Sequence, residues 1–358
     1  MNDHIVTMPG RALMTPAFPS TYANPLVADR RLQDALDAAL AAGPGKQWRT
    51  PVALVSLSPD GTRPVAQHKG NEVHFSASLL KVAAMYAAFE LRGTLRKIAL
   101  ELGAATSATE LLQTAAAYLD PQILGMAATI PALQGVARAH AVPQYASVFE
   151  VVPRPEPGRG FTVELAAGFK GHLERMIAVS DNGSAAQCVH GSGYGYLDGA
   201  LAAAGFFDPA RNVGVWLAGD YAGNYPFYRI PSVNDGLVAQ ATTVMHLAQM
   251  YVLLHDGLLV DEISSREMMS LLAKAVAVPE VFLDRASDLD FEVTHTKVGL
   301  GPLKPENGGA NVYSEGSILQ HASGRKFAVV WQNYLFGDDG FDPIGHVVRD
   351  AIRTYLGR

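Results

Sequence analysis

Hydrophobic and polar positions in the first part of the chain predict a helix followed by a hairpin. Leucines recur every four residues between an Asn-Pro pair and a glycine, and this predicts a helix over residues 24–43. Residues 51–58 (PVALVSLS) predict a buried strand. The Asp-Gly turn that follows predicts a hairpin whose second strand covers residues 63–68.

The middle of the chain has mostly apolar residues at helical spacing. Residues 76–91 (SASLLKVAAMYAAFEL) are apolar almost all round, which predicts a helix buried on most of its faces. Residues 92–142 are helical in composition, with proline breaks after Asp120 and Ile130. Two further helices are predicted, over residues 165–179 and 239–254.

The last third of the chain changes to the period of strands. Alternation predicts strands over residues 291–297, 312–320 and 326–333, and an Asp-Pro cap at Asp342 predicts a final helix. The order is therefore helix, two strands, a long helical middle, three strands and a helix. One antiparallel sheet made from both chain ends, covered by the terminal helices, buries these faces with the fewest elements.

We therefore expect an α/β fold of the α+β type, with the helical middle as a second lobe. The expected organisation is an N-terminal arm over residues 1–24, a sheet lobe over 25–91 and 245–358, and a mainly helical lobe over 92–244. We expect the two lobes to form a single catalytic unit. Oligomeric state is not readable from the sequence.

Composition excludes several classes of protein. The chain has 358 residues, of which 49% are hydrophobic and 17% charged, so it is not a disordered chain. A net charge of −6 argues against a general binder of nucleic acid or anionic membranes. No apolar run is long enough to span a membrane. The one cysteine, Cys188, excludes an intramolecular disulfide, and we expect it to be a buried core thiol.

Neither a metal nor another cofactor is expected. The eleven histidines show no H-x-x-x-H spacing, and the glycines of residues 191–195 lack the spacing of a dinucleotide loop. The chain as written begins with no basic segment followed by an apolar run, which predicts a cytoplasmic protein. The alternative is a periplasmic or secreted protein whose start has been assigned wrongly.

Three short motifs carry the candidate chemistry. They are S-x-x-K at Ser78–Lys81, S-D-N at Ser180–Asn182 and K-x-G at Lys297–Gly299. Residues three apart share a helix face, so Lys81 can reach Ser78. A serine hydroxyl needs a base, and both burial and the nearby cation Lys297 lower the pKa of Lys81. A second S-x-x-K, Ser323–Lys326, lies in a polar turn, and we expect no role for it.

These motifs, in this order and on these elements, resemble the serine β-lactamase and penicillin-binding protein superfamily, and most closely class A β-lactamases. The resemblance extends over about residues 25–358. It implies a β-lactamase-like fold and a serine hydrolase that acts through an acyl-enzyme, with no cofactor and a small-molecule substrate.

The resemblance also implies a role for each motif residue. Ser78 is acylated, Lys81 is the base or proton relay, and Ser180 passes the proton to the leaving group. Asn182 contacts the substrate amide and orients Lys81, while Lys297 anchors a substrate carboxylate.

The resemblance implies an oxyanion hole as well. The backbone N–H groups of Ser78 and Leu300 form this hole, and the adjacent Gly299 also lies at the substrate. Val298 stands where the family has a threonine, so one hydroxyl that binds substrate is missing. Thr296 is the candidate to replace it.

Class A enzymes use a glutamate and an asparagine to hold the water for deacylation, and no such glutamate is visible. Asp220 and Asn224 have the same spacing, within the irregular stretch 211–235. We therefore expect Asp220 to be the base for deacylation and Asn224 its partner, so that Asp220→Ala traps an acyl-enzyme. The alternative is a turn aspartate.

The substrate stays open at this level. The first expectation is a β-lactamase-related hydrolase of amides, lactams or esters. The alternatives are an intracellular esterase, amidase or peptidase, and a penicillin-binding-type sensor that is acylated without turnover. Ser78 and Ser180 are 102 residues apart, well above the usual spacing, and the extra residues within 92–165 are expected to reshape the cleft.

Overall fold

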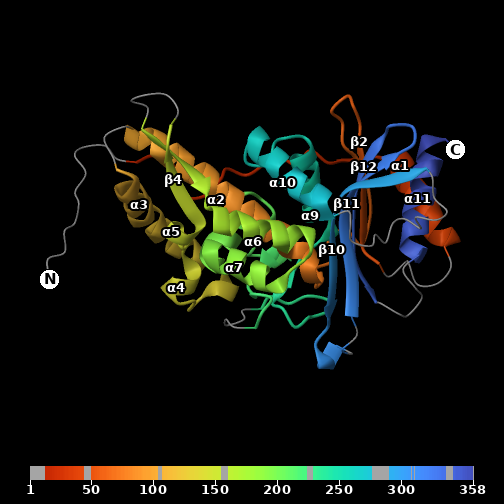
Figure 1. The fold of residues 1–358 in the computed structure, drawn as a ribbon. Coiled ribbons are helices and arrows are strands. Elements are labelled where there is room, and N and C mark those ends of the chain that lie inside the picture. Colours follow the sequence, from red (N-terminus) through yellow and green to blue (C-terminus); the bar gives the residue numbers. More distant parts are fainter. Residues whose placement is uncertain are drawn as a thin grey trace.

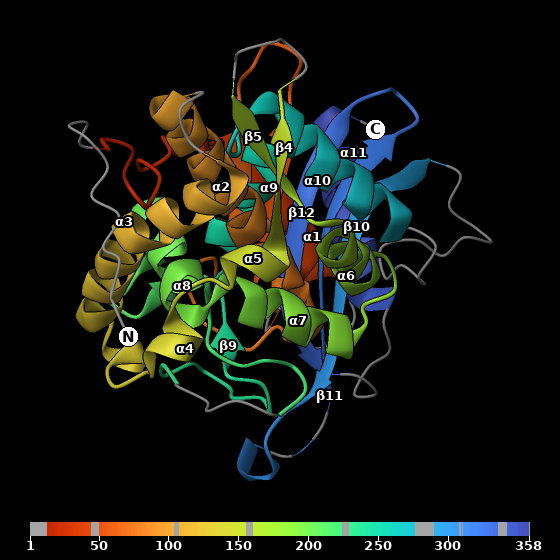
Figure 2. The same ribbon diagram turned by 60° about the vertical axis from the view of Figure 1, so that its left-hand side comes forward.

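The described parts of the chain form a sheet with helices on both faces (Figures 1 and 2). The structure is a computed structural model. It describes residues 13–43, 50–103, 107–154, 160–223, 229–275, 290–307, 309, 311–335 and 342–357.

Both ends of the chain contribute to a six-stranded sheet. In sheet order the strands are β1 (Val27–Ala28), β3 (Pro64–His68), β2 (Val52–Leu57), β12 (Lys326–Leu335), β11 (Asn311–His321) and β10 (Phe291–Pro302). The two-residue β1 pairs parallel with β3, and all other neighbours are antiparallel. The expected sheet and the α+β class are confirmed.

Helices α1 (Arg30–Ala42) and α11 (Asp342–Leu356) cover the outer face of the sheet, at the right of Figure 1. Leu32 and Leu36 of α1, and Val348 and Ile352 of α11, are fully buried in one apolar cluster with side chains of that face. Because these positions recur every three to four residues, each helix turns one stripe toward the sheet.

The other face of the sheet carries the rest of the helices. These are α2 (Lys81–Leu102), α3 (Ala108–Thr129), α4 (Arg138–Ala141), α5 (Tyr145–Val148), α6 (Ala167–Ala178), α7 (Asn182–Ser192), α8 (Tyr194–Ala203), α9 (Val244–His255) and α10 (Glu262–Lys274). Helix α9 lies on β2, β11 and β12. Helix α2 is buried along most of its length, as its composition predicted, and it brings the sheet and the helical region together.

The first helix begins later than the sequence predicted. It starts at Arg30, and the Asp29 side chain caps it by accepting the Leu32 N–H at 2.7 Å. The side chain of Asn24 instead accepts the Leu26 N–H in a local turn. The pairing of β1 with β3 takes up the residues in between, and this pairing excludes an earlier start.

The helical middle also differs from the prediction. The break after Ile130 is present, but Pro121 lies inside α3, where buried Leu119 and Ile123 pack on either side of it. An antiparallel hairpin, β4 (Phe149–Pro153) with β5 (Phe161–Leu165), interrupts the helices. Helix α10 was not predicted. The glycine-rich segment 191–195 ends α7 and begins α8.

Close packing between β11 and α9 gives a test of this architecture. A Cβ atom at Gly316 would lie 2.5 Å from Cε2 of the buried Tyr251. We expect Gly316→Ala to lower the free energy of unfolding by about 1–3 kcal/mol, because the overpacked core must shift. Denaturant unfolding measures this. The control is Gly125→Ala in α3, where a Cβ would meet nothing within 4 Å, and it should raise stability by up to about 1 kcal/mol. Equal stability of the two variants would contradict the packing.

Candidate active site

Ser78 lies in a 3-10 turn, Ala77–Leu80, that leads directly into α2. The sequence predicted a regular helix here. The turn is fixed from two sides, because Ser314 Oγ of β11 donates to Ser76 O at 2.6 Å and Gln240 Nε2 donates to Ala77 O at 2.6 Å. Ser78 is half-buried, whereas the residues that hold the turn are buried. The backbone just before Ser78 is thus held in place, and within the described residues the Ser78 hydroxyl forms no hydrogen bond with Lys81 or Ser180.

Lys81 is the first residue of α2, and its side chain is fully buried. Its Nζ donates to Ser180 O at 2.6 Å, to Asn182 Oδ1 at 2.7 Å and, less closely, to Ser180 Oγ at 3.3 Å. Burial lowers the pKa of Lys81 to about 7, against the opposite effect of Asp181. A lysine with this pKa can accept a proton near neutral pH.

Ser180 lies between α6 and α7, and its hydroxyl is shared by two lysines. Nζ of Lys297 donates to Ser180 Oγ at 2.9 Å, in addition to the longer contact from Lys81. Asp181 caps α7 through the Ser184 N–H at 2.7 Å, and this fixes the turn that carries Ser180. The S-D-N motif therefore supplies a hydroxyl, a helix cap and the Asn182 amide to one place.

Lys297 reaches Ser180 from β10. It is almost fully buried, and burial together with the charge of Lys81 holds the pKa of Lys297 well below its usual value. An irregularity in the β10–β11 pairing between Val293 and His295 changes which face the later residues occupy. Val293 packs under the outer helices, whereas Lys297, four residues later, points toward the helical side.

Gly299 allows β10 to approach the turn that carries Ser78. A Cβ atom at this position would lie 2.2 Å from Ser76 O and 2.7 Å from Leu79 N, so no larger residue fits without movement. The next residue, Leu300, is half exposed at 50%. This placement is compatible with the predicted oxyanion hole from the Ser78 and Leu300 N–H groups, which stays a prediction.

Thr296 lies away from the other motif residues. It is fully buried, its hydroxyl donates to Glu315 Oε1 at 2.9 Å, and it accepts from Ser317 Oγ at 2.7 Å. Its neighbour Val298 belongs to the outer cluster under α1 and α11. Thr296 therefore does not offer the hydroxyl that Val298 lacks, because both side chains lie on the face opposite to Lys297.

Asp220 also differs in placement from the expectation. Its carboxylate is fully buried, accepts the N–H groups of Ala222 and Gly223 at 3.1 and 2.6 Å, and lies 3.2 Å from His190 Nε2. It hydrogen-bonds neither Ser78 nor Lys81 within the described chain. Its role in deacylation stays a prediction without support from these contacts, and Asn224 lies outside the described residues.

The residue that lies against Lys81 is Tyr221, which the sequence analysis did not identify. Its ring centroid is 4.9 Å from Lys81 Nζ. Spacing carries no signal for this contact, because it depends on how the loop after β8 (Trp216–Leu217) folds back. His190, Ser314 and Gln240 were missed for the same reason.

Three of the six non-glycine residues with positive φ angles in the described chain lie near Lys81, and the other three, Lys69, Asn212 and Val260, lie outside the three motifs. Ala77, Ser180 and Tyr221 have positive φ angles of 48°, 59° and 61° although none is glycine. Such conformations cost about 1–3 kcal/mol each and persist only where the surroundings impose them. All three lie in the motif segments or in contact with Lys81.

Other candidates lie outside this arrangement. Cys188 is buried, as predicted, and burial raises the pKa of its thiol. His295 pairs with Ile318 of the inner cluster, so it shares the face of Lys297. Within the described ranges, no three His, Cys, Asp or Glu side chains gather as metal ligands. In that same part of the chain, no helix is long and apolar enough to cross a bilayer.

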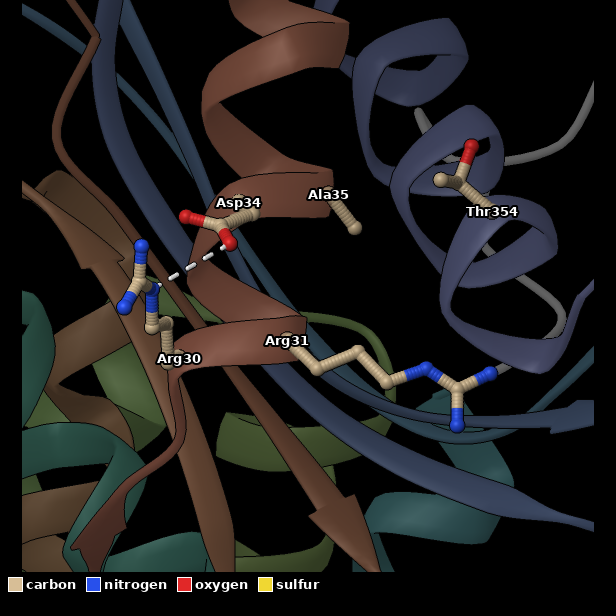
Figure 3. Close-up of a pocket in the computed structure, with 5 residues that line it drawn as sticks. All are labelled: Arg30, Arg31, Asp34, Ala35 and Thr354. Carbon is tan, nitrogen blue, oxygen red and sulfur yellow. Dashed lines mark ion pairs between the residues drawn. The ribbon is translucent and has the colours of Figure 1, made fainter.

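A surface pocket on α1 and α11 lies on the opposite side of the sheet (Figure 3). Arg30 and Asp34, an ion pair at 3.7 Å, line it on α1, and both side chains are strongly exposed. Arg31, which also lines the pocket, lies over the ring of Tyr355. The pocket is therefore separate from the arrangement around Ser78.

Comparison with known proteins gives matches in structure. No family model matches the chain, and no curated protein matches its sequence. The structure of PBP-A is similar with a TM-score of 0.52 and 13% identity, over 95% of this chain and 100% of that one. TLA-1 extended-spectrum β-lactamase gives 0.51 and 11%, over 91% and 98%. A class A β-lactamase representative from Bacteroides cellulosilyticus DSM 14838 gives 0.51 and 12%, over 94% and 100%.

Identities of 11–13% show the fold and leave the activity open. The likeness extends over nearly the whole chain. The chain has the fold of the serine β-lactamase and penicillin-binding protein superfamily.

Proposed function

We propose that this chain is a serine hydrolase that forms an acyl-enzyme through Ser78 on an amide, lactam or ester. The observation that carries the proposal is the hydroxyl of Ser180 between two buried lysines, Lys297 at 2.9 Å and Lys81 at 3.3 Å. Two buried ammonium groups that lie close together repel each other, and this lowers the pKa of both lysines. One of them is therefore available in its neutral form. In this proposal Ser78 is the nucleophile, Lys81 is the base, and Ser180, which is hydrogen-bonded to both lysines, is the proton path.

The reaction follows from these groups. Neutral Lys81 takes the proton of Ser78 Oγ as this oxygen attacks the substrate carbonyl carbon. The carbonyl π electrons move to oxygen and return as the bond to the leaving nitrogen or oxygen breaks. Ser180 gives its proton to the leaving group and is reprotonated from Lys81. Water then attacks the ester carbonyl of the acyl-enzyme, which releases the acid and restores Ser78.

Lys297 favours a substrate with a carboxylate. It forms no ion pair with an acidic side chain among the described residues, so a substrate anion would be its counter-ion. The side chains of Val298 and Thr296 both lie on the other face of the strand, so neither provides a further donor. A carboxylate would therefore be held by Lys297 and Ser180, with less specific geometry than three donors provide.

A second candidate function is a penicillin-binding-type protein that stays acylated. In the described part of the chain, the hydrogen-bond partners of Lys81 are Ser180 and Asn182, and the ring of Tyr221 lies on another side. No carboxylate there contacts Ser78 or Lys81 to activate water, and this favours a long-lived acyl-enzyme. An intracellular esterase, amidase or peptidase is the remaining alternative, with the same Ser78 chemistry.

Intact-protein mass spectrometry tests the acyl-enzyme. After incubation with a chromogenic cephalosporin or, separately, an activated ester, we expect wild type to carry one adduct and Ser78→Ala to carry none. The control is Ser323→Ala in the second S-x-x-K, which should label as wild type does. The lifetime of the adduct separates the hydrolase from the sensor. Equal labelling of wild type and Ser78→Ala would exclude Ser78 as the nucleophile.

The pH dependence of acylation tests the base. With a Lys81 pKa of about 7, the neutral form is lost below that pH. We expect the burst rate with the activated ester to fall about tenfold per pH unit below 7 and to be level above it. Lys81→Arg should abolish the burst, and with it the fall in burst rate below pH 7, because arginine stays protonated. A burst rate that does not change between pH 5 and pH 8 would argue for another base.

A further inference from the structure

A strained loop holds Tyr221 against Lys81. Tyr221 has a φ of 61°, a conformation that is costly for an aromatic residue, and its side chain is nearly buried at 9% exposed. Its ring centroid lies 4.9 Å from Lys81 Nζ. The phenol hydroxyl is buried without a hydrogen-bond partner among the described residues. The contact of this side chain with Lys81 that the structure describes is therefore the one made by the ring.

Asp220 and His190 fix the loop that carries this ring. The Asp220 carboxylate binds the N–H groups of the two residues after Tyr221, so it closes the loop directly around the tyrosine. The same carboxylate lies 3.2 Å from His190 Nε2 on α7. Helix α7 begins with Asn182, which binds Lys81, so the loop and the lysine are tied to the same helix.

We propose that Tyr221 is a positioning residue that keeps water from the Lys81 side chain and so sets the pH at which Lys81 can accept a proton. Asp220 and His190 hold the loop in place for this. The inference deepens the proposed function, and its consequence for catalysis rests on that function.

Charged and titratable groups face Lys81 from several elements. Burial is the largest cause of its lowered pKa, and Asp181 and Cys188 of α7 act in the opposite direction. Lys297 on β10 is the second cation of the site. The ring of Tyr221 has two effects, because its face attracts a cation while its bulk removes water. Since burial dominates, removal of the ring should favour the protonated lysine.

The groups around the loop are titratable as well. Burial lowers the pKa of His190, against the charge of Asp220, and His140 faces this histidine too. Burial also raises the pKa of Tyr221, which Tyr194 faces from α8, so Tyr221 is a neutral phenol in the range where Lys81 titrates.

A direct titration of Lys81 tests the inference without any substrate. The full chain is labelled with an isotope at the lysine ε-carbons, and the Lys81 resonance is assigned by its loss in Lys81→Arg. NMR then follows this resonance with pH in wild type and in variants of Tyr221. We expect Tyr221→Ala to raise the pKa of Lys81 by at least about one unit, because water reaches the ammonium group. Tyr221→Phe is the matched control and should titrate as wild type does.

Asp220→Asn gives a second test whose sign is diagnostic. Loss of a negative charge alone would lower the pKa of Lys81, whereas release of the loop that holds Tyr221 would raise it. We expect a rise smaller than that of Tyr221→Ala. If Tyr221→Ala does not fold, the sign in Asp220→Asn decides. An unchanged or lowered Lys81 pKa in the folded variants would overturn the inference.

The acylation burst separates this inference from the proposed function. If the acyl-enzyme and the role of Tyr221 are both correct, the pH below which the burst rate falls is higher in Tyr221→Ala, by the same amount as the NMR titration shows. A Lys81 pKa that shifts in NMR while wild type shows no Ser78 adduct would support the role of Tyr221 and reject the acyl-enzyme. If wild type forms a Ser78 adduct while the Lys81 pKa is the same in wild type and Tyr221→Ala, the acyl-enzyme is supported and the role of Tyr221 is rejected.

Discussion

Two buried lysines that share one serine hydroxyl are the constraint on which the site depends. Lys81 and Lys297 come from different elements, and neither forms an ion pair within the described residues, so their charges must be relieved by other means. Burial holds the pKa of both lysines below the usual value, and oxygen atoms of Ser180, Asn182 and Val298 accept hydrogen bonds from their amino groups. A fold optimised for stability alone would avoid such a pair, because buried unpaired cations are costly.

The rest of the architecture brings the three chain segments of the site together. Helix α2, which runs through the core between the sheet and the helical region, begins with Lys81. The edge strand β10 contains Lys297. Gly299 lets that strand approach the backbone of the Ser78 turn, since any Cβ there would overlap Ser76 O. The sheet is therefore one wall of the site as well as the support of the outer helices.

Strain and burial around Lys81 point to pre-organisation. The positive φ angles of Ala77, Ser180 and Tyr221 aim the turn, the shared hydroxyl and the ring at one small region. Each conformation is held by neighbours, such as the Asp220 carboxylate around Tyr221 and the Gln240 amide on Ala77 O. In the proposed function, these supports would bury the lysine and orient the Ser180 hydroxyl before a substrate binds.

The sequence alone determined the fold class, the sheet from both chain ends, the burial of α2 and the choice of the motif residues. These follow from local periodicity and from residue types that have few other uses, such as a lysine in the apolar helix that begins after Ser78. Tertiary structure decided four other features: the start of α1, the β4–β5 hairpin, the outward placement of Thr296 and the contact of Tyr221 with Lys81. In each case a long-range contact overrides the local pattern. The β1–β3 pairing shortens the first helix, and the pairing irregularity in β10 sets the face on which Thr296 lies. The buried Asp220 carboxylate places Tyr221. No spacing along the chain encodes such contacts.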